Sequence, residues 1–135
     1  MASLAVYFLM MTNTDVTLYQ KTIVAGSEVW ERREIVGTET PYGAFWEDRK
    51  ATNVIQSGLI EAYKVAIYLP DIEKIEALGI LIGDVVVKGK VNDTVSAGFT
   101  ITDLKKKYPN TVVIKSIDTL DYGSAPMQHI QLGAS

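Results

Sequence analysis

Short runs of alternating apolar and polar residues recur along the chain, and this pattern most restricts what it can fold into. The runs are too short for long amphipathic helices, and the glycine, proline and asparagine residues between them favour turns. Seven runs have this character: residues 15–21, 28–36, 41–49, 63–69, 83–89, 111–117 and 129–132. We therefore expect a mainly β fold, a small β-barrel or sandwich of about seven short strands.

One or two short helices should accompany the strands. The first is predicted over residues 72–78, because Asp71 can accept hydrogen bonds from the first turn and Gly79 can end the helix.

The second helix is predicted as a single turn that ends at Lys107 and begins at Thr102 or Asp103. Just before it, Phe99 and Ile101 alternate with polar residues, which indicates a further short strand.

The 135 residues are the length of one domain, and an apolar content of 47% is enough to build a core without disulfides. We expect a single domain over residues 1–135, with a β-barrel at 15–134 and a candidate N-terminal arm at 1–14. The apolar run at 4–11 is too short to span a bilayer and lacks the basic start of a signal peptide, so no membrane association is expected.

The expected core is a single cluster of apolar residues drawn from four of the strands. Its members are Trp46, Val65, Ile67, Val85, Val87, Val113 and Ile117.

Charge and cysteine content argue against a protein that grips nucleic acid or holds a thiolate site. The formal net charge is −3 and there is no cysteine. The one dense basic run, Lys105 to Lys107, is interpreted as the solvated face of a short helix, because phosphate binding needs a larger basic patch.

No set of residues in the sequence suggests catalysis, so the chain is not expected to be an enzyme. The single histidine, His129, has no second histidine or cysteine with which to hold a metal, and is interpreted as a structural residue. Glu47 and Asp48 are adjacent and would point to opposite faces of a strand. Nucleotide-binding glycine motifs and a serine-hydrolase elbow are absent. We expect no catalytic, cofactor-binding or metal-binding residues and no cofactor.

The order of the segments resembles that of a known viral family. The segments that carry the likeness are DVTLYQK (15–21), Trp30, Phe45-Trp46, VAIYLP (65–70), GDVVVKG (83–89), TVVIKSID (111–118), YGS (122–124) and MQHIQLGA (127–134). Together they resemble the minor capsid or head-closure proteins of tailed bacteriophages, which form the head-tail connector.

The resemblance implies a stopper, a small β-barrel with an inserted loop that closes the portal channel after DNA packaging and provides the tail attachment surface. It implies a homo-oligomeric ring, six-fold or alternatively twelve-fold, in the neck of the virion, assembled in the host cytoplasm. The adaptor and portal proteins would lie above the ring and the tail terminator or tail tube below. DNA would pass through without sequence-specific binding.

Two alternatives stay open. The first is a tail terminator or another tail-completion protein. The second, more distant, is a small oligonucleotide- or carbohydrate-binding β-barrel, which would need an aromatic platform on one face of its sheet.

The long inserted loop is predicted at residues 51–62, with apolar residues on a barrel too small to bury them all. We expect it to contact a partner only in the assembled ring. The predicted partner-contact residues are Ile55, Ser57, Gly58, Leu59 and Ile60. The alternative is that the apolar residues of this loop fold over an open end of the barrel.

Overall fold

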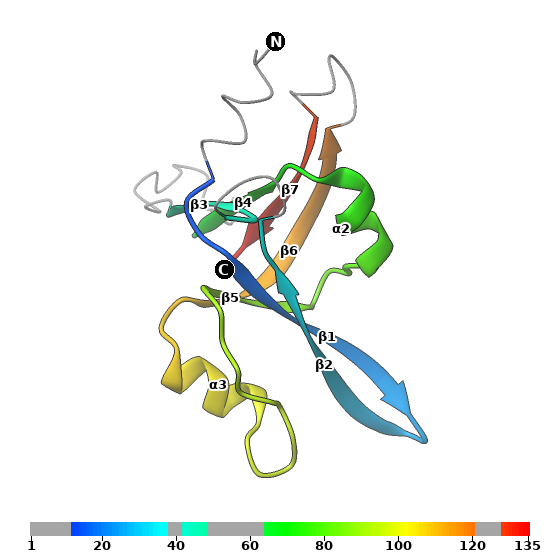
Figure 1. Cartoon of the computed structure of the whole chain (residues 1–135). Helices are drawn as coiled ribbons and strands as arrows, with labels where there is room; N and C mark the ends of the chain where they lie inside the picture. Colours follow the sequence, from blue (N-terminus) through cyan, green and yellow to red (C-terminus); the bar gives the residue numbers. More distant parts are fainter. Residues whose placement is uncertain (1–11, 38–41, 49–63, 121–127) are drawn as a thin grey trace, which may run out of the picture.

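The computed structural model describes residues 12–37, 42–48, 64–120 and 128–135, and within them seven antiparallel strands form one sheet (Figure 1). The strands are β1 (Val16–Val24), β2 (Ser27–Ile35), β3 (Phe45–Asp48), β4 (Val65–Leu69), β5 (Val85–Lys88), β6 (Thr111–Leu120) and β7 (His129–Ala134). Their order across the sheet is β2-β1-β5-β6-β7-β4-β3. The prediction of a mainly β fold is confirmed.

The sheet curls without closing into a barrel. Its last strand, β3, comes back to the chain just before β1, where Thr14 forms an isolated antiparallel bridge with Ala44. The Ala44 carbonyl accepts hydrogen bonds from the backbone N–H groups of Asn13 and Thr14, at 2.9 and 3.2 Å. The β3 end of the sheet is therefore brought back to the chain that leads into β1, and the interior is enclosed by a curled sheet.

The main core lies inside the curl and receives side chains from all seven strands. Ile75 of helix α2 (Ile72–Leu78) joins it, with Ile72 and Leu78 packed against its side. The buried members are Val16, Leu18, Ile35, Ala44, Trp46, Val65, Ile67, Leu69, Ile75, Val86, Val112, Ile114, Ile130, Leu132 and Ala134.

A second core lies on the opposite face of β1, β5 and β6, under helix α3 (Ile101–Lys107). Tyr19 and Leu104 meet there, and both are completely buried. Its buried members are Tyr19, Val85, Val87, Val91 and Leu104, with Trp30, Val95, Phe99, Ile101, Tyr108 and Val113 packed around them.

The prediction of one core is therefore wrong. Trp46, Val65 and Ile67 belong to the main core, with Ile117 packed against it. The other three predicted members, Val85, Val87 and Val113, belong to the second core. Successive side chains of a strand point to opposite faces, so Val86 enters the main core while its neighbours on either side enter the second.

Helix α2 forms where the sequence predicts it. The Asp71 carboxylate accepts a hydrogen bond from the backbone N–H of Lys74 at 3.2 Å, and Gly79 ends the helix in the left-handed region at φ 67°. Glycine has no Cβ and adopts that conformation without strain, which is why the helix stops there.

Helix α3 begins earlier than predicted. Thr100 is the N-cap, and its hydroxyl and the Asp103 carboxylate bond each other's backbone N–H groups in a capping box. Ile101 is thus helical, and Phe99 takes part only in an isolated bridge with Ser96, so the predicted strand at this place is wrong. Lys105 to Lys107 are exposed in the last turn, as predicted.

Candidate assembly surface

The β1–β2 hairpin projects beyond the rest of the fold (Figure 1). The first five residues of β1 are buried, whereas residues 21–24 are exposed. Ala25 and Gly26 form a two-residue turn with φ of 52° and 82°, the positive values that a type I′ hairpin turn requires. At the tip, Ile23 and Val24 are 70% and 58% exposed. The outer half of this hairpin is an arm with an apolar tip.

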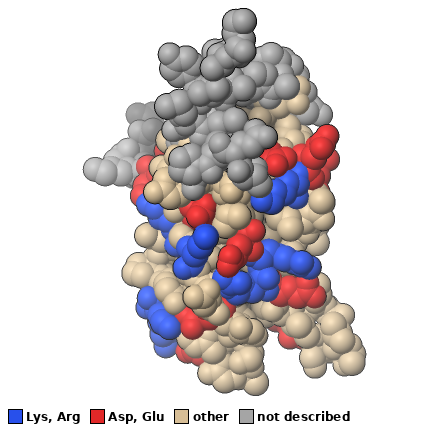
Figure 2. Space-filling view, viewed as in Figure 1, with Lys and Arg blue, Asp and Glu red and all other residues tan. Residues whose placement is uncertain are grey.

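A groove of about 530 Å³ runs between the arm and the segment that leads into α3. In Figure 2 the lower end of the molecule divides into two lobes with a hollow between them. Half-buried Trp30 lies on the arm side and Ile101 on the helix side. The lining residues are Glu28, Val29, Trp30, Val95, Ser96, Ala97, Thr100, Ile101 and Thr102.

Strand β2 is an edge strand, because the described part of the sheet ends with it. Val24 and Ser27 flank the turn and form a hydrogen-bonded pair. Hydrogen-bonded pairs alternate along an antiparallel ladder, so in β2 every second residue, counted from Ser27, directs its backbone N–H and C=O toward β1. The backbone N–H and C=O of Glu28, Trp30, Arg32 and Glu34 therefore point away from β1. No hydrogen bond to these outward groups occurs among the described residues.

The opposite edge of the sheet, β3, is covered by the chain's own residues. The Asn13 side chain donates to the Trp46 carbonyl at 3.0 Å and accepts from the Trp46 N–H at 2.8 Å, in the manner of a neighbouring strand. Edge strands left open are templates for pairing with another chain. Among the described residues, β2 is thus the edge at which the sheet can be extended.

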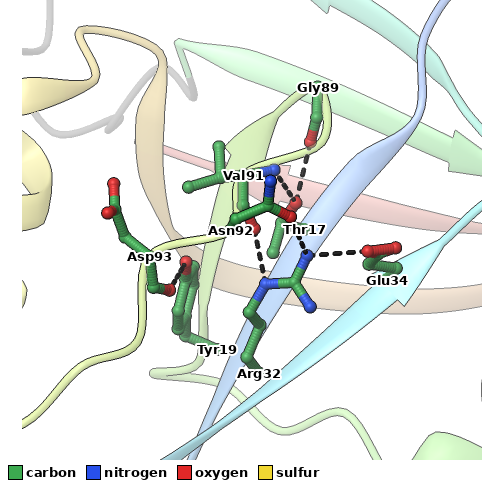
Figure 3. Close-up of polar contacts among 8 residues, drawn as sticks. All are labelled: Thr17, Tyr19, Arg32, Glu34, Gly89, Val91, Asn92 and Asp93. Atoms are coloured by element: carbon green, nitrogen blue, oxygen red, sulfur yellow. Dashed lines mark hydrogen bonds and ion pairs between the residues drawn. The ribbon is translucent and has the colours of Figure 1, made fainter.

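A buried threonine fixes the loop that follows β5 onto β1 (Figure 3). The Thr17 hydroxyl donates to the Gly89 carbonyl at 2.8 Å and accepts from the Val91 N–H at 2.9 Å. Thr17 is completely buried, so this one hydroxyl satisfies two backbone groups where water is absent. The loop that forms one wall of the groove is held to the sheet by these two bonds.

Arg32 ties the same loop to β2. Its Nε donates to the Val91 carbonyl, and its guanidinium lies 2.7 Å from a Glu34 carboxylate oxygen and 3.4 Å from the Asn92 side-chain oxygen (Figure 3). The hydrogen bond from Arg32 lowers the pKa of Glu34 below its usual range. The Arg32 side chain is thus turned toward the loop, and its charge is matched by Glu34.

Asp93, in the same loop, holds it to β1 and to the end of α3 with three contacts. Its backbone carbonyl accepts from the Tyr19 hydroxyl at 2.6 Å, and its carboxylate accepts from the Tyr108 hydroxyl and pairs with Lys107 at 2.9 Å. The hydrogen bonds from Tyr108 and Lys107 lower the pKa of Asp93, and the hydrogen bond to Asp93 raises the pKa of Tyr108. Burial raises the pKa of Tyr19. These contacts fix the loop to β1 and α3.

The whole predicted loop at 51–62 lies outside the described residues, and so does most of the candidate N-terminal arm at 1–14. The loop contains all the predicted partner-contact residues: Ile55, Ser57, Gly58, Leu59 and Ile60. Those interpretations stay predictions.

His129 is half-buried at the start of β7, with its ring 5.6 Å from that of Tyr68. In the described part of the chain, no three side chains of the kinds that bind metals cluster together. Nor does any helix there have the length and apolar content needed to cross a membrane.

The predicted strands left out the end of the arm, because the run at 15–21 was ended at Lys21 and the next was begun at Glu28. Gly26 is the local signal for the turn, since it follows Ala25 in a two-residue hairpin turn. The groove had no local signal, because its walls come from segments about 70 residues apart, such as Trp30 and Ile101.

The fold and this surface define a small, mainly β domain with a projecting arm and one open sheet edge in its described part. The chain belongs to the family of unknown function DUF6751, which it matches over residues 11–135. No curated protein and no solved structure matches it.

Proposed function

We propose that the chain is a structural subunit of the tailed-phage neck, specifically the stopper that closes the portal channel after DNA packaging and provides the tail attachment surface. The proposal extends the likeness of its segments to head-closure proteins. The structural observation that supports it is the arm, whose tip exposes Ile23 and Val24 to solvent. The proposal assigns the chain no catalytic activity, metal or cofactor.

The exposed tip supports an assembly role because apolar side chains at the end of an arm contribute nothing to the subunit's own core. Burying them against a neighbour would release about 25 cal/mol for each Å² of apolar surface removed from water. In the proposed assembly the neighbour is another copy in a homo-oligomeric ring, six-fold or alternatively twelve-fold. The portal and adaptor lie above it, and the tail terminator or tail tube below.

The distribution of charge supports a channel wall that lets DNA pass. Basic and acidic side chains alternate over the described face in Figure 2 rather than forming a basic patch. On the arm and β2 the cations are paired: Lys21 with Glu28 at 3.0 Å, Arg32 with Glu34 at 2.7 Å and Arg33 with Glu31 at 2.9 Å. Paired cations neutralise phosphates poorly, so DNA would slide past without being gripped.

The experiment is to purify the protein and examine it by negative-stain electron microscopy, and to locate it in intact particles with a labelled antibody. We expect rings in the first case and label at the head-tail junction in the second. Replacing Ile23 and Val24 together by Asp should leave a folded subunit that forms no rings and yields heads that lose their DNA. Ala77→Asp, which also adds a carboxylate at an exposed position but on α2, should still form rings.

Label at any other place in the particle would contradict the proposal. Label at the end of the tail tube, with rings still formed, would favour the tail terminator instead.

A second candidate function, binding of an oligonucleotide or a carbohydrate, is favoured by a row of rings on β3, β4 and β7. Phe45 and Tyr68 have ring centroids 5.7 Å apart, and Tyr68 and His129 are 5.6 Å apart. The rings are tilted to one another by 53° and 59°, however, so they do not offer one flat stacking surface. Quenching of tyrosine fluorescence by oligo(dT) or by an oligosaccharide at micromolar concentration would favour this candidate over the neck protein.

A further inference from the structure

We propose that the open edge of β2 pairs with the β2 edge of a second copy, antiparallel and centred on Arg32, so that two sheets become one. The outward backbone groups of Trp30, Arg32 and Glu34 supply the hydrogen bonds. The opposite edge of the described sheet cannot take this role, because Asn13 covers it at Trp46. Edge-to-edge pairing between described strands of two copies therefore has to be β2 with β2.

The charges of β2 are arranged for this pairing. When Arg32 faces its own counterpart across a twofold axis, Glu31 of each copy lies directly opposite Arg33 of the other. Both side chains are about half exposed and project from the face opposite α3. Within one copy they already pair at 2.9 Å, so the two copies together place four charges of alternating sign in one cluster.

The two Arg32 residues lie opposite each other, but their guanidinium groups do not form an unneutralised pair of like charges. Each guanidinium is turned toward its own loop, where it bonds the Val91 carbonyl, and each is matched by Glu34 at 2.7 Å. On the same face, Trp30 of one copy lies opposite Glu34 of the other.

Neighbouring registers fit less well. Centring the pair on Glu31 would set Glu31 against its counterpart and Glu28 against Glu34, which are like charges directly opposite each other. Centring it on Arg33 would set Arg33 against its counterpart, again like charges directly opposite each other. It would also bring the partner strand to Ile35, where Gly43 already packs so closely that a Cβ added to it would lie 2.7 Å from the Ile35 carbonyl oxygen. Pairing about Arg32 needs only residues 30–34.

This contact is twofold and closes on itself, whereas a ring needs head-to-tail contacts. The pairing is therefore separate from the ring surface of the proposed function. If it fails, the proposed function stands, and if the ring fails, the pairing can still be measured in the unassembled protein.

The first test is sedimentation equilibrium of charge variants. Glu31→Arg and Arg33→Glu should each weaken self-association about tenfold or more, since each sets like charges opposite at both symmetry-related sites. An equimolar mixture of the two variants should associate as well as the wild type, because every opposed pair is again of opposite sign. The double variant E31R/R33E should also self-associate. Wild-type protein that does not self-associate, or single variants that associate like the wild type, would overturn the pairing.

The second test fixes the register by disulfide formation, which is clean because the chain has no cysteine. Residues at opposed positions of a pair that is not hydrogen-bonded have Cα atoms about 4.5 Å apart, within disulfide range. Oxidising a mixture of Glu31→Cys and Arg33→Cys proteins should give the mixed dimer, while each alone should give little. A mixture of Glu31→Cys with Glu73→Cys, an exposed position on α2, is the control. Equal crosslinking in all four samples would rule out the register.

Discussion

The two-core arrangement predicts which pairs of core substitutions act independently. Ile67 and Leu132 face each other across β4 and β7 in the main core, whereas Val87 is in the second core, on the opposite face of the sheet. Substitutions that share no neighbours add in their effect on the free energy of unfolding, and substitutions in contact do not.

The sizes of the single effects follow from burial. Ile67 and Val87 are at most 1% exposed, as is Leu132. Ile67→Val should cost about 1 kcal/mol and Leu132→Ala about 3 kcal/mol. Val87→Ala removes two methyl groups at roughly 0.8 kcal/mol each and leaves a small cavity, so its cost should be about 2 kcal/mol.

Urea denaturation of the single and double variants measures these free energies. The pair Ile67→Val with Val87→Ala should be additive to within about 0.5 kcal/mol, and Ile67→Val with Leu132→Ala should depart from additivity by more than that. If the first pair is coupled as strongly as the second, the two clusters form one core and the assignment of these side chains to opposite faces is refuted.

Two further predictions concern the loop that walls the groove. Thr17→Val should cost about 1–3 kcal/mol in urea denaturation, because it leaves the Val91 N–H buried without an acceptor, and Thr22→Val on the exposed arm should cost far less. The Tyr108 hydrogen bond keeps the pKa of Asp93 in the folded protein below its usual 3.8. As the pH falls toward 3.8, Asp93 therefore takes up a proton in the unfolded chain while it stays ionised in the folded protein, and this difference favours unfolding. Stability should therefore fall as pH drops below about 4, and Asp93→Asn should make that fall shallower in thermal melts; an unchanged slope would contradict the assignment.

Sequence reasoning located the elements whose signals are local. Helix α2 was predicted with its own bounds because Asp71 and Gly79 act on backbone groups within one turn of the helix. The capping box of α3 was also present as Thr100 and Asp103 three residues apart, yet the alternation of Phe99 and Ile101 favoured a strand.

The sequence did not reveal that the second face of the sheet is also covered by a core. Val85, Val86 and Val87 are uniformly apolar, so alternation cannot tell which of them points where. Only the position of α3 and its loop shows that both faces are covered. The open edge of β2 was equally hidden, because the strand order, and with it the last strand, is set by long-range pairing. The charges of β2 are present in the sequence, but their opposition across a twofold axis depends on that edge being free.

Strand β1 contains a boundary that bears on how such a subunit can change over time. The Gln20 side chain donates to the Leu78 carbonyl at 2.6 Å, and the Lys21 backbone N–H donates to the Asp84 carboxylate at 3.3 Å, so the strand belongs to the folded body up to Lys21. From Thr22 onward its residues are exposed. The outer part, Thr22 to Val29, can unpair locally without disturbing the cores, as segments with few buried contacts do. Natural selection can thus alter the tip to suit a different neighbour without lowering the stability of the domain that carries it.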